Sequence, residues 1–365
     1  MIATHLVRDD GIVLSCDVGT SSCRTALFSV RDGSLIENSL VNEFSINLWT
    51  YKPLSHDENF MEQSSMNIWT QICRSVRKTL ELSRVQPEQV IGLCFDATCS
   101  LVAWNVATDS PVSVTFDETD NDRNVILWAD HRSIQETNEI NQTQHNVLRF
   151  VGGRMSPEMQ LPKIKFLQTH CINHLNDNVH YFDLADWLTF KCSGNIIRRS
   201  QCTTACKWGY VFSEDNQDQN IINKGWNAEF LQMIGLKHLV EPKNRIGSEI
   251  CEIGTFDKTP LRLSNTSAQE LGLLGGTPIA VPVIDAHAGG IGIIGAALTE
   301  DTTVTELERT LVLIVSIVYT MEEGSITTIG YRQVHPAVTW LFPRTQSLWA
   351  VYGVLTVTLW YRDCT

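Results

Sequence analysis

The sequence has few basic residues and no long hydrophobic run. Lys and Arg number 28 against 41 Asp and Glu, a formal net charge of −13, so the chain lacks the excess of positive charge that binds nucleic acids or anionic membranes. Its most apolar run, Leu311 to Tyr319, is too short to cross a bilayer. The N-terminus has no apolar signal core. We therefore expect a cytoplasmic protein whose partner is neither nucleic acid nor membrane.

The sequence also lacks a CxxC pair. Its 11 cysteines are an odd number at irregular spacings, which favours reduced thiols over a secreted disulfide framework. Cys202 and Cys206 lie close in sequence, but a tetrahedral zinc site needs further Cys or His ligands at fixed spacings. We expect no structural zinc here.

The composition is that of a globular protein, with 43% hydrophobic and 19% charged residues and no internal repeat. The 365 residues exceed the roughly 250–300 at which one hydrophobic core stops growing. One large lobe and an extra segment are therefore predicted.

The N-terminal third predicts a mixed α/β sheet. Two β-prone runs within residues 11–30 flank a Gly/Thr/Ser turn and predict a hairpin, and residues 34–46 predict a third strand. A helix with one apolar face should follow, capped by Ser64 or Ser65. Residues 90–95 predict the next strand. The order is β-β-β-α-β, which indicates an α/β fold.

The later part of the chain continues as α/β structure. Residues 134–148 and 162–169 have helical patterns, and residues 182–190 resemble a strand that runs into a helix. Residues 277–284 predict a buried strand and residues 286–298 a Gly- and Ala-rich helix.

The turn after the first strand carries the first candidate site. In a tight Gly-containing turn, backbone N–H groups bind anions, and the hydroxyls of Thr20 and Ser21 beside Gly19 can donate to phosphate oxygens. Asp17 is placed to hold Mg²⁺, often through water, and Arg24 to neutralise a phosphoryl group. The alternative is a plain hairpin turn with a solvated Asp.

Asp285 is the second candidate. It stands between a predicted strand and a predicted helix, the place where ligands gather in open α/β sheets. A carboxylate there can accept a proton from a substrate hydroxyl, or it can cap the helix. We expect the neighbouring His287 to pack or to form a hydrogen bond rather than to relay protons.

Gly290, Gly292 and Gly295 match the GxGxxG pattern of dinucleotide sites. That pattern begins directly at a strand end, whereas here four residues intervene. We expect these glycines inside the helix, where they allow close packing.

Seven segments follow one another as they do in the FGGY carbohydrate kinases, and most closely as in the ribulokinase-like branch. They are residues 17–22, 92–100, 128–132, 162–165, 183–188, 206–208 and 285–290. The resemblance implies an actin-like, ribonuclease H-like ATPase fold of two lobes, with ATP, Mg²⁺ and a sugar bound in the cleft between them.

The resemblance also implies roles for single residues. Asp17 matches the acidic residue that organises Mg²⁺, and Asp285 matches the base that activates the sugar hydroxyl and contacts the sugar. The first phosphate motif corresponds to Gly19, Thr20, Ser21 and Arg24. The positions that contact a ketose correspond to Asp96, Thr98, Cys99 and Lys207. Trp128, Asp130 and Arg132 look structural, with Arg132 locking a loop by pairing with Asp130 or a backbone carbonyl.

Residues 11–298 are then expected to form the N-terminal, sugar-binding lobe. Residues 299–365 resemble nothing in the family, so we expect an atypical tail, with the second, ATP-binding lobe missing or aberrant through a frameshift or an alternative exon. The implied function is an ATP-dependent kinase that phosphorylates a pentulose such as ribulose. Its partner is a small-molecule sugar, a ketopentose or a polyol, and homodimer formation is left open. The alternative is a catalytically incomplete sugar-binding or interaction fragment.

Overall fold

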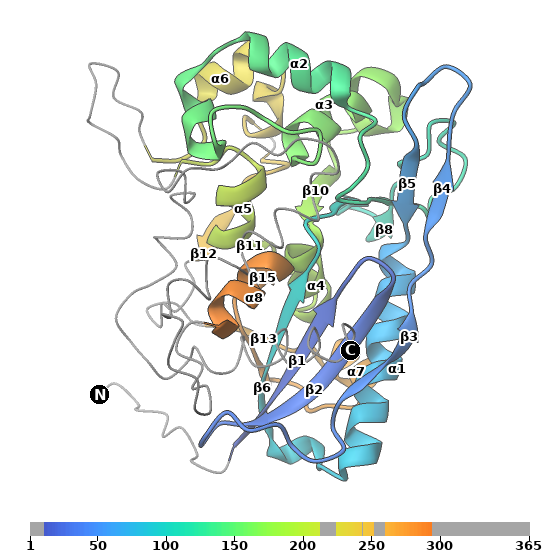
Figure 1. Ribbon diagram of the computed structural model, residues 1–365, viewed down its shortest axis with the longest axis vertical. Coiled ribbons are helices and arrows are strands. Elements are labelled where there is room, and N and C mark those ends of the chain that lie inside the picture. The colour runs from blue at the N-terminus through green and yellow to red at the C-terminus, as the bar shows by residue number, and fades with distance from the viewer. Residues whose placement is uncertain (1–10, 212–223, 243, 252–259, 294–365) are drawn as a thin grey trace, which may run out of the picture.

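A computed structural model describes residues 11–211, 224–242, 244–251 and 260–293 of the chain. The tail predicted for residues 299–365 and the end of the helix predicted for residues 286–298 lie outside the described residues. Figure 1 shows a strand-rich half with helix α1 along one side, and a second half in which helices α2, α3 and α6 gather.

The first sheet holds the N-terminal hairpin. Its strand order is β13-β14-β6-β1-β2-β3, and β15 also pairs with β6. Strands β1 and β2 are antiparallel, whereas β6 runs parallel to β1 and to both β14 and β15. The strands are β1 (Ile12–Val18), β2 (Ser22–Ser29), β3 (Val41–Ser45), β6 (Val90–Ala97), β13 (Leu261–Arg262), β14 (Pro278–Ile279) and β15 (Val283–Ile284).

Side chains along β1 and β6 point alternately to opposite sides of the sheet, so its two faces carry different residues. Leu14, Cys16 and Phe95 point into the main hydrophobic core with helices α1, α4 and α7. Asp17 and Asp96, one residue out of phase, belong to the opposite face, toward which α5 and α8 lie. The helices are α1 (Ser65–Ser83), α4 (Leu184–Cys192), α5 (Gln201–Lys207), α7 (Asn265–Leu271) and α8 (Asp285–Ile293). The sheet thus carries a core on one face and polar groups on the other.

The second sheet has the order β10-β7-β9-β5-β4, with β8 paired to β7. A second apolar cluster joins it to α2, α3 and α6. Its strands are β4 (Trp49–Tyr51), β5 (Phe60–Gln63), β7 (Leu101–Asn105), β8 (Ser110–Pro111), β9 (Val125–Ile126) and β10 (Val179–Asp183). The helices are α2 (Ile134–Gln142), α3 (Gln160–His170) and α6 (Ala228–Met233). Strands β11 (Arg198–Ser200) and β12 (Glu249–Cys251) form a small parallel pair.

Four short 3₁₀ helices complete the described elements. They are η1 (Pro87–Gln89), η2 (Asn146–Val151), η3 (Ile172–Leu175) and η4 (Lys237–Leu239).

The predicted opening β-β-β-α-β is confirmed within the first sheet, and α1 begins directly after its N-cap Ser64, whose hydroxyl accepts the Asn67 N–H. Strands β4 and β5, which were not predicted, are inserted before α1 and belong to the second sheet. The single strand predicted for residues 277–284 was wrong, because that segment forms β14 and β15, which pair with β6 separately. The helix predicted for residues 134–148 ends at Gln142 and is followed by η2.

Candidate functional site

Three parallel strands end at one edge of the first sheet, and each end carries an aspartate. Asp17 of β1 lies opposite Asp96 of β6 in the strand register, and Asp96 lies opposite Val283 of β15, two residues before Asp285. Asp285 begins α8 and accepts the Ala286 N–H at 2.7 Å. Carboxyl ends of parallel strands are where α/β sheets bind ligands. The sheet therefore brings together three predicted site residues, Asp17, Asp96 and Asp285, with Asp96 on the strand between the other two.

The three carboxyl groups repel each other in a buried place. Asp96 is 2% exposed, and burial with the nearby Asp17 and Asp285 charges raises its pKa well above the usual range. Burial and Asp17 also raise the pKa of Asp285 to about 6, although the Ala286 N–H, Lys207 and Arg24 act in the opposite direction. A carboxyl with a pKa near 6 is suited to accept a proton at neutral pH.

The turn between β1 and β2 holds the predicted phosphate residues. The hairpin prediction is confirmed, since Gly19 N–H bonds Ser22 O at 3.0 Å across the turn. Arg24 returns from β2 and its guanidinium lies 2.9 Å from Asp17 Oδ2. Ser21 is exposed, and Thr20 is partly buried. The turn thus combines hydroxyls and a cation directly beside the carboxylates.

The predicted sugar-contacting residues lie on two elements. Asp96 is within β6, while Thr98 and Cys99 follow it in the connection to β7. Lys207 closes α5, and its ammonium lies 4.0 Å from Glu158 Oε2. Burial alone would lower the pKa of Lys207, but neighbouring Cys99 and Glu158 raise it above the usual range. The ammonium is therefore charged beside the loop that carries Cys99.

His287 contacts thiols, which agrees with the expectation that it packs or forms hydrogen bonds. Its Nδ1 lies 2.9 Å from Cys202 Sγ, and its Nε2 lies 3.4 Å from Cys206 Sγ. Among the residues that the structure describes, no group of three His, Cys, Asp or Glu side chains is arranged to hold a metal ion. Gly290 and Gly292 lie inside α8, as predicted; Gly295 lies outside the described residues.

Mg²⁺ bound to a nucleotide keeps several waters and uses one or two protein carboxylates rather than a full protein cage. Asp17 and Asp285 at this edge supply carboxylate oxygens, the hard ligands that Mg²⁺ prefers. In addition, Asp96 Oδ1 is buried without a hydrogen-bond partner among the described residues. The residues fit a nucleotide-bound Mg²⁺ at this edge.

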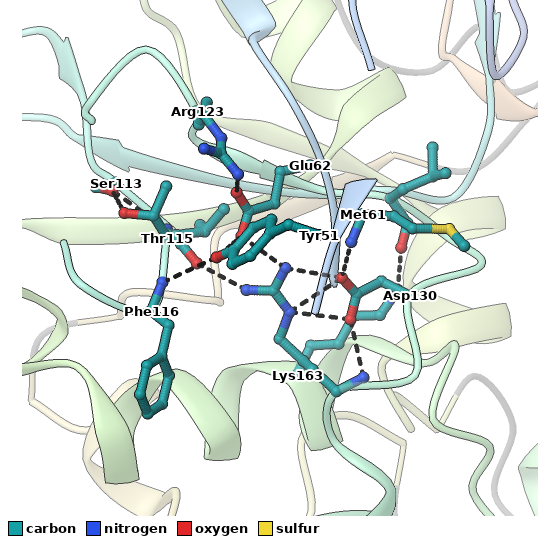
Figure 2. Close-up of polar contacts among 12 residues, drawn as sticks. Tyr51, Met61, Glu62, Ser113, Thr115, Phe116, Arg123, Asp130 and Lys163 are labelled. Carbon is teal, nitrogen blue, oxygen red and sulfur yellow. Dashed lines mark hydrogen bonds and ion pairs between the residues drawn. The ribbon is translucent and has the colours of Figure 1, made fainter. Parts of the chain in front are cut away.

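Arg132 belongs to a buried network that does not include Asp17, Asp96 or Asp285. Figure 2 labels its partners Glu62 and Asp130 and the neighbouring Arg123. Its guanidinium bonds Asp130 Oδ2 at 2.7 Å, Glu62 Oε1 at 2.9 Å and the Val114 carbonyl at 2.7 Å. Arg123 approaches the other oxygen of Glu62 at 2.5 Å. The prediction that Arg132 pairs with Asp130 or a backbone carbonyl is confirmed, because it does both.

Sequence reasoning missed how the site is connected to its surroundings. The Trp128 indole N–H donates to Thr20 Oγ1 at 2.9 Å, and Gln63 Nε2 donates to the Thr20 carbonyl at 2.6 Å. Glu158 lies between Lys207 and His131, whose Nε2 is 3.7 Å from Glu158 Oε1. Trp128 and Thr20 are 108 residues apart in the sequence, so no local sequence pattern predicts their contact.

Comparisons with known proteins give one consistent result. Residues 12–292 match the N-terminal domain of the FGGY family of carbohydrate kinases. A D-ribulokinase of Saccharomyces cerevisiae is 37% identical over 288 residues, which are 77% of this chain and 38% of that protein. The human FGGY carbohydrate kinase domain-containing protein is 38% identical over 285 residues, 77% of this chain and 46% of that protein.

Among solved structures, a ligand-bound xylulose kinase from Lactobacillus acidophilus aligns with a TM-score of 0.58 at 14% sequence identity, covering 78% of this chain and 50% of its own. This likeness shows the fold, and it agrees with the predicted actin-like α/β lobe. The chain spans about half the length of the curated relatives it matches, or less. No helix within the described ranges is both long and apolar enough to span a membrane.

Proposed function

The chain belongs to the FGGY family of carbohydrate kinases, and we propose that it serves the ATP-dependent phosphorylation of a pentulose such as ribulose. The observation that carries the proposal is the meeting of Asp17, Asp96 and Asp285 at one strand edge, beside the Thr20 turn. The relative named D-ribulokinase, 37% identical, supports a pentulose as substrate. In this proposal residues 11–298 form the sugar-binding lobe.

Asp285 acts as the base. Its pKa of about 6 leaves it ionised at neutral pH and still basic enough to take a proton. As it removes the proton from the sugar hydroxyl, the hydroxyl oxygen forms a bond to the γ-phosphorus of ATP. The bond from that phosphorus to the bridging oxygen breaks, and ADP leaves with the electron pair. The products are the sugar phosphate and ADP.

The other residues position the reactants, since phosphoryl transfer depends mainly on positioning and charge stabilisation. Thr98, Cys99 and the charged Lys207 hold the sugar hydroxyls on the β6–β7 side. Gly19, Thr20, Ser21 and Arg24 hold phosphate oxygens on the hairpin side. Mg²⁺, when bound with ATP, neutralises phosphate charge, and Asp17 is the residue that would hold it.

A sugar panel with the purified chain, ATP and Mg²⁺ tests the proposal. The kinase proposal predicts ADP release with ribulose or a related ketopentose, and loss of that release in Asp285→Ala; a chain in which the ATP-binding lobe is missing or aberrant would release no ADP. Activity that survives Asp285→Ala would remove the catalytic assignment. Calorimetry with the same sugars adds the second arm: sugar binding without ATP binding or turnover supports the sugar-binding fragment instead of the kinase.

A further inference from the structure

Trp128 touches both sides of the candidate site. Its indole N–H donates to Thr20 Oγ1, in the turn between β1 and β2 that holds the predicted phosphate residues, at 2.9 Å. Its backbone N–H donates to Ser100 Oγ at 3.1 Å, and Ser100 Oγ lies 3.0 Å from Thr98 Oγ1 on the predicted sugar loop. One residue therefore links the two loops that must hold donor and acceptor.

The contact with Thr20 has a chemical consequence. A hydroxyl has one proton to donate and two lone pairs to accept with. Because the indole is a donor only, it occupies a lone pair of Thr20 Oγ1, and the hydroxyl proton must point away from the indole. The Thr20 carbonyl is held separately by Gln63 Nε2. The orientation of Thr20 is thus set from both its side chain and its backbone.

Trp128 itself is firmly held. Lys163, which is 0% exposed, donates from its ammonium to the Leu127 carbonyl at 2.8 Å and the Trp128 carbonyl at 3.1 Å. The ring packs against the buried cluster that contains Cys99 and Ile284. A side chain fixed at its backbone and along its ring is a suitable anchor for a neighbouring hydroxyl, because little freedom remains to be lost when a ligand binds.

We propose that Trp128 is a positioning residue for phosphoryl transfer: its indole N–H directs the Thr20 hydroxyl proton toward a phosphate oxygen of the nucleotide. The inference rests on the proposed kinase function. It assigns Trp128 an action through Thr20, distinct from a contact between the indole ring and the sugar. A role through Thr20 affects the chemical step, whereas a contact with the sugar affects sugar affinity.

Steady-state kinetics on the full chain separate these roles. Trp128→Phe keeps an aromatic ring and removes the N–H, and Thr20→Val keeps the shape and removes the hydroxyl. We expect each substitution to lower kcat by about tenfold, the effect of one lost hydrogen bond of about 1.4 kcal/mol. The KM for the sugar should stay within about twofold. The double variant should be no slower than either single variant, because both remove the same interaction.

Trp104→Phe is the matched control, since the Trp104 indole N–H also donates to a side chain, Asp109, but away from the site. Its kcat should match that of the unmodified chain. The inference is overturned if Trp128→Phe raises only the sugar KM, or if the effects of Trp128→Phe and Thr20→Val multiply.

A second measurement keeps the inference separate from the fate of the kinase proposal. In a chain with ¹⁵N-labelled tryptophan, the indole signal that disappears in Trp128→Phe should shift in Thr20→Val and stay near its place in Thr20→Ser, which retains the hydroxyl. If the unmodified chain shows no turnover, the kinase function is contradicted. The indole signal then still tests whether Trp128 forms its hydrogen bond with Thr20. An indole signal whose chemical shift does not change in Thr20→Val overturns the inference that Trp128 orients Thr20.

Discussion

Two regions of the molecule bury several charged groups in opposite ways. They are the strand-edge carboxylates (Asp17, Asp96 and Asp285) and the Arg132 network (Arg132, Asp130, Glu62 and Arg123). In the network, Arg132 lies between Asp130 and Glu62, so each negative charge faces a positive one. Burial would lower the pKa of Arg132, yet these two carboxylates outweigh it and raise the pKa. At the strand edge, like charges meet, because the charges of Asp17 and Asp285 act on the buried Asp96 and raise its pKa.

This difference separates a structural arrangement from a functional one. A buried charge that is paired and hydrogen-bonded maintains a loop at little net cost, and it becomes expensive only when one partner is removed. Carboxylates held close together are unfavourable in the folded state and persist where they serve chemistry, since active sites commonly carry such perturbed groups. The comparison predicts that substitutions in the network damage stability, while substitutions at the strand edge damage activity.

The largest expected effect is on turnover in Asp285→Asn. Removing the base should lower kcat by about 1000-fold, equivalent to about 4 kcal/mol in the barrier. ADP release with ribulose measures it, and Asp32→Asn, a change of the same kind in an exposed turn, is the control. If Asp285→Asn also lowers the melting temperature so far that the chain is unfolded under the assay conditions, a purely chemical role is contradicted.

Arg132→Met should cost at least about 3 kcal/mol of unfolding free energy, because it leaves Asp130 and Glu62 buried without their shared partner. Urea unfolding followed by circular dichroism measures the loss. Lys78→Met removes an exposed cation that pairs with Glu81 at 3.4 Å and should change stability by less than about 0.5 kcal/mol. Equal losses in the two variants would show that the network is no stronger than a surface pair.

The pH dependence tests the strand edge alone. With a pKa of about 6, Asp285 loses its base form as the pH falls below 6, so kcat/KM should drop by about tenfold per unit in that range. Since the folded pKa lies above the ordinary value of 3.8, this group favours folding at low pH, and its contribution is lost as the pH rises through about 6. The difference in unfolding free energy between the unmodified chain and Asp285→Asn should therefore fall between pH 4 and 7 while the activity of the unmodified chain rises; a flat rate profile there would exclude Asp285 as the base.

Among the substitutions at the strand edge and in the network, the smallest expected effect is in Asp96→Asn. Burial and the charges of Asp17 and Asp285 favour the neutral form of Asp96, which Asn resembles, so unfolding free energy at neutral pH should change by less than about 1 kcal/mol. Asp130→Asn, the matched change in the network, should cost about 3 kcal/mol, since Arg132 loses a charged partner. If both variants lose the same stability, the two regions do not differ as proposed.

Local sequence signals were enough for several elements. Helix α1 begins after Ser64, as expected, because a hydroxyl cap and a periodic apolar face are encoded within a few residues. The hairpin of β1 and β2 is local for the same reason. Strands β14 and β15 have two residues each and pair separately with β6, and β14 also pairs with β13. These pairings join segments far apart in the sequence, so the apolar run of residues 277–284 was interpreted as one strand.

The candidate site divides in the same way. Motif order singled out Asp17 and Asp285, and the pairing of Arg132 with Asp130 follows from a spacing of two residues. Chain composition and motif order therefore sufficed for the α/β family and for the chemistry of single residues. The contacts of Asp96 with its two charged neighbours, and of Trp128 with Thr20, depend on strand register and on segments 108 residues apart. Such proximity is a property of the packed chain, because only packing removes water and brings distant charges and hydroxyls within a few ångströms of each other.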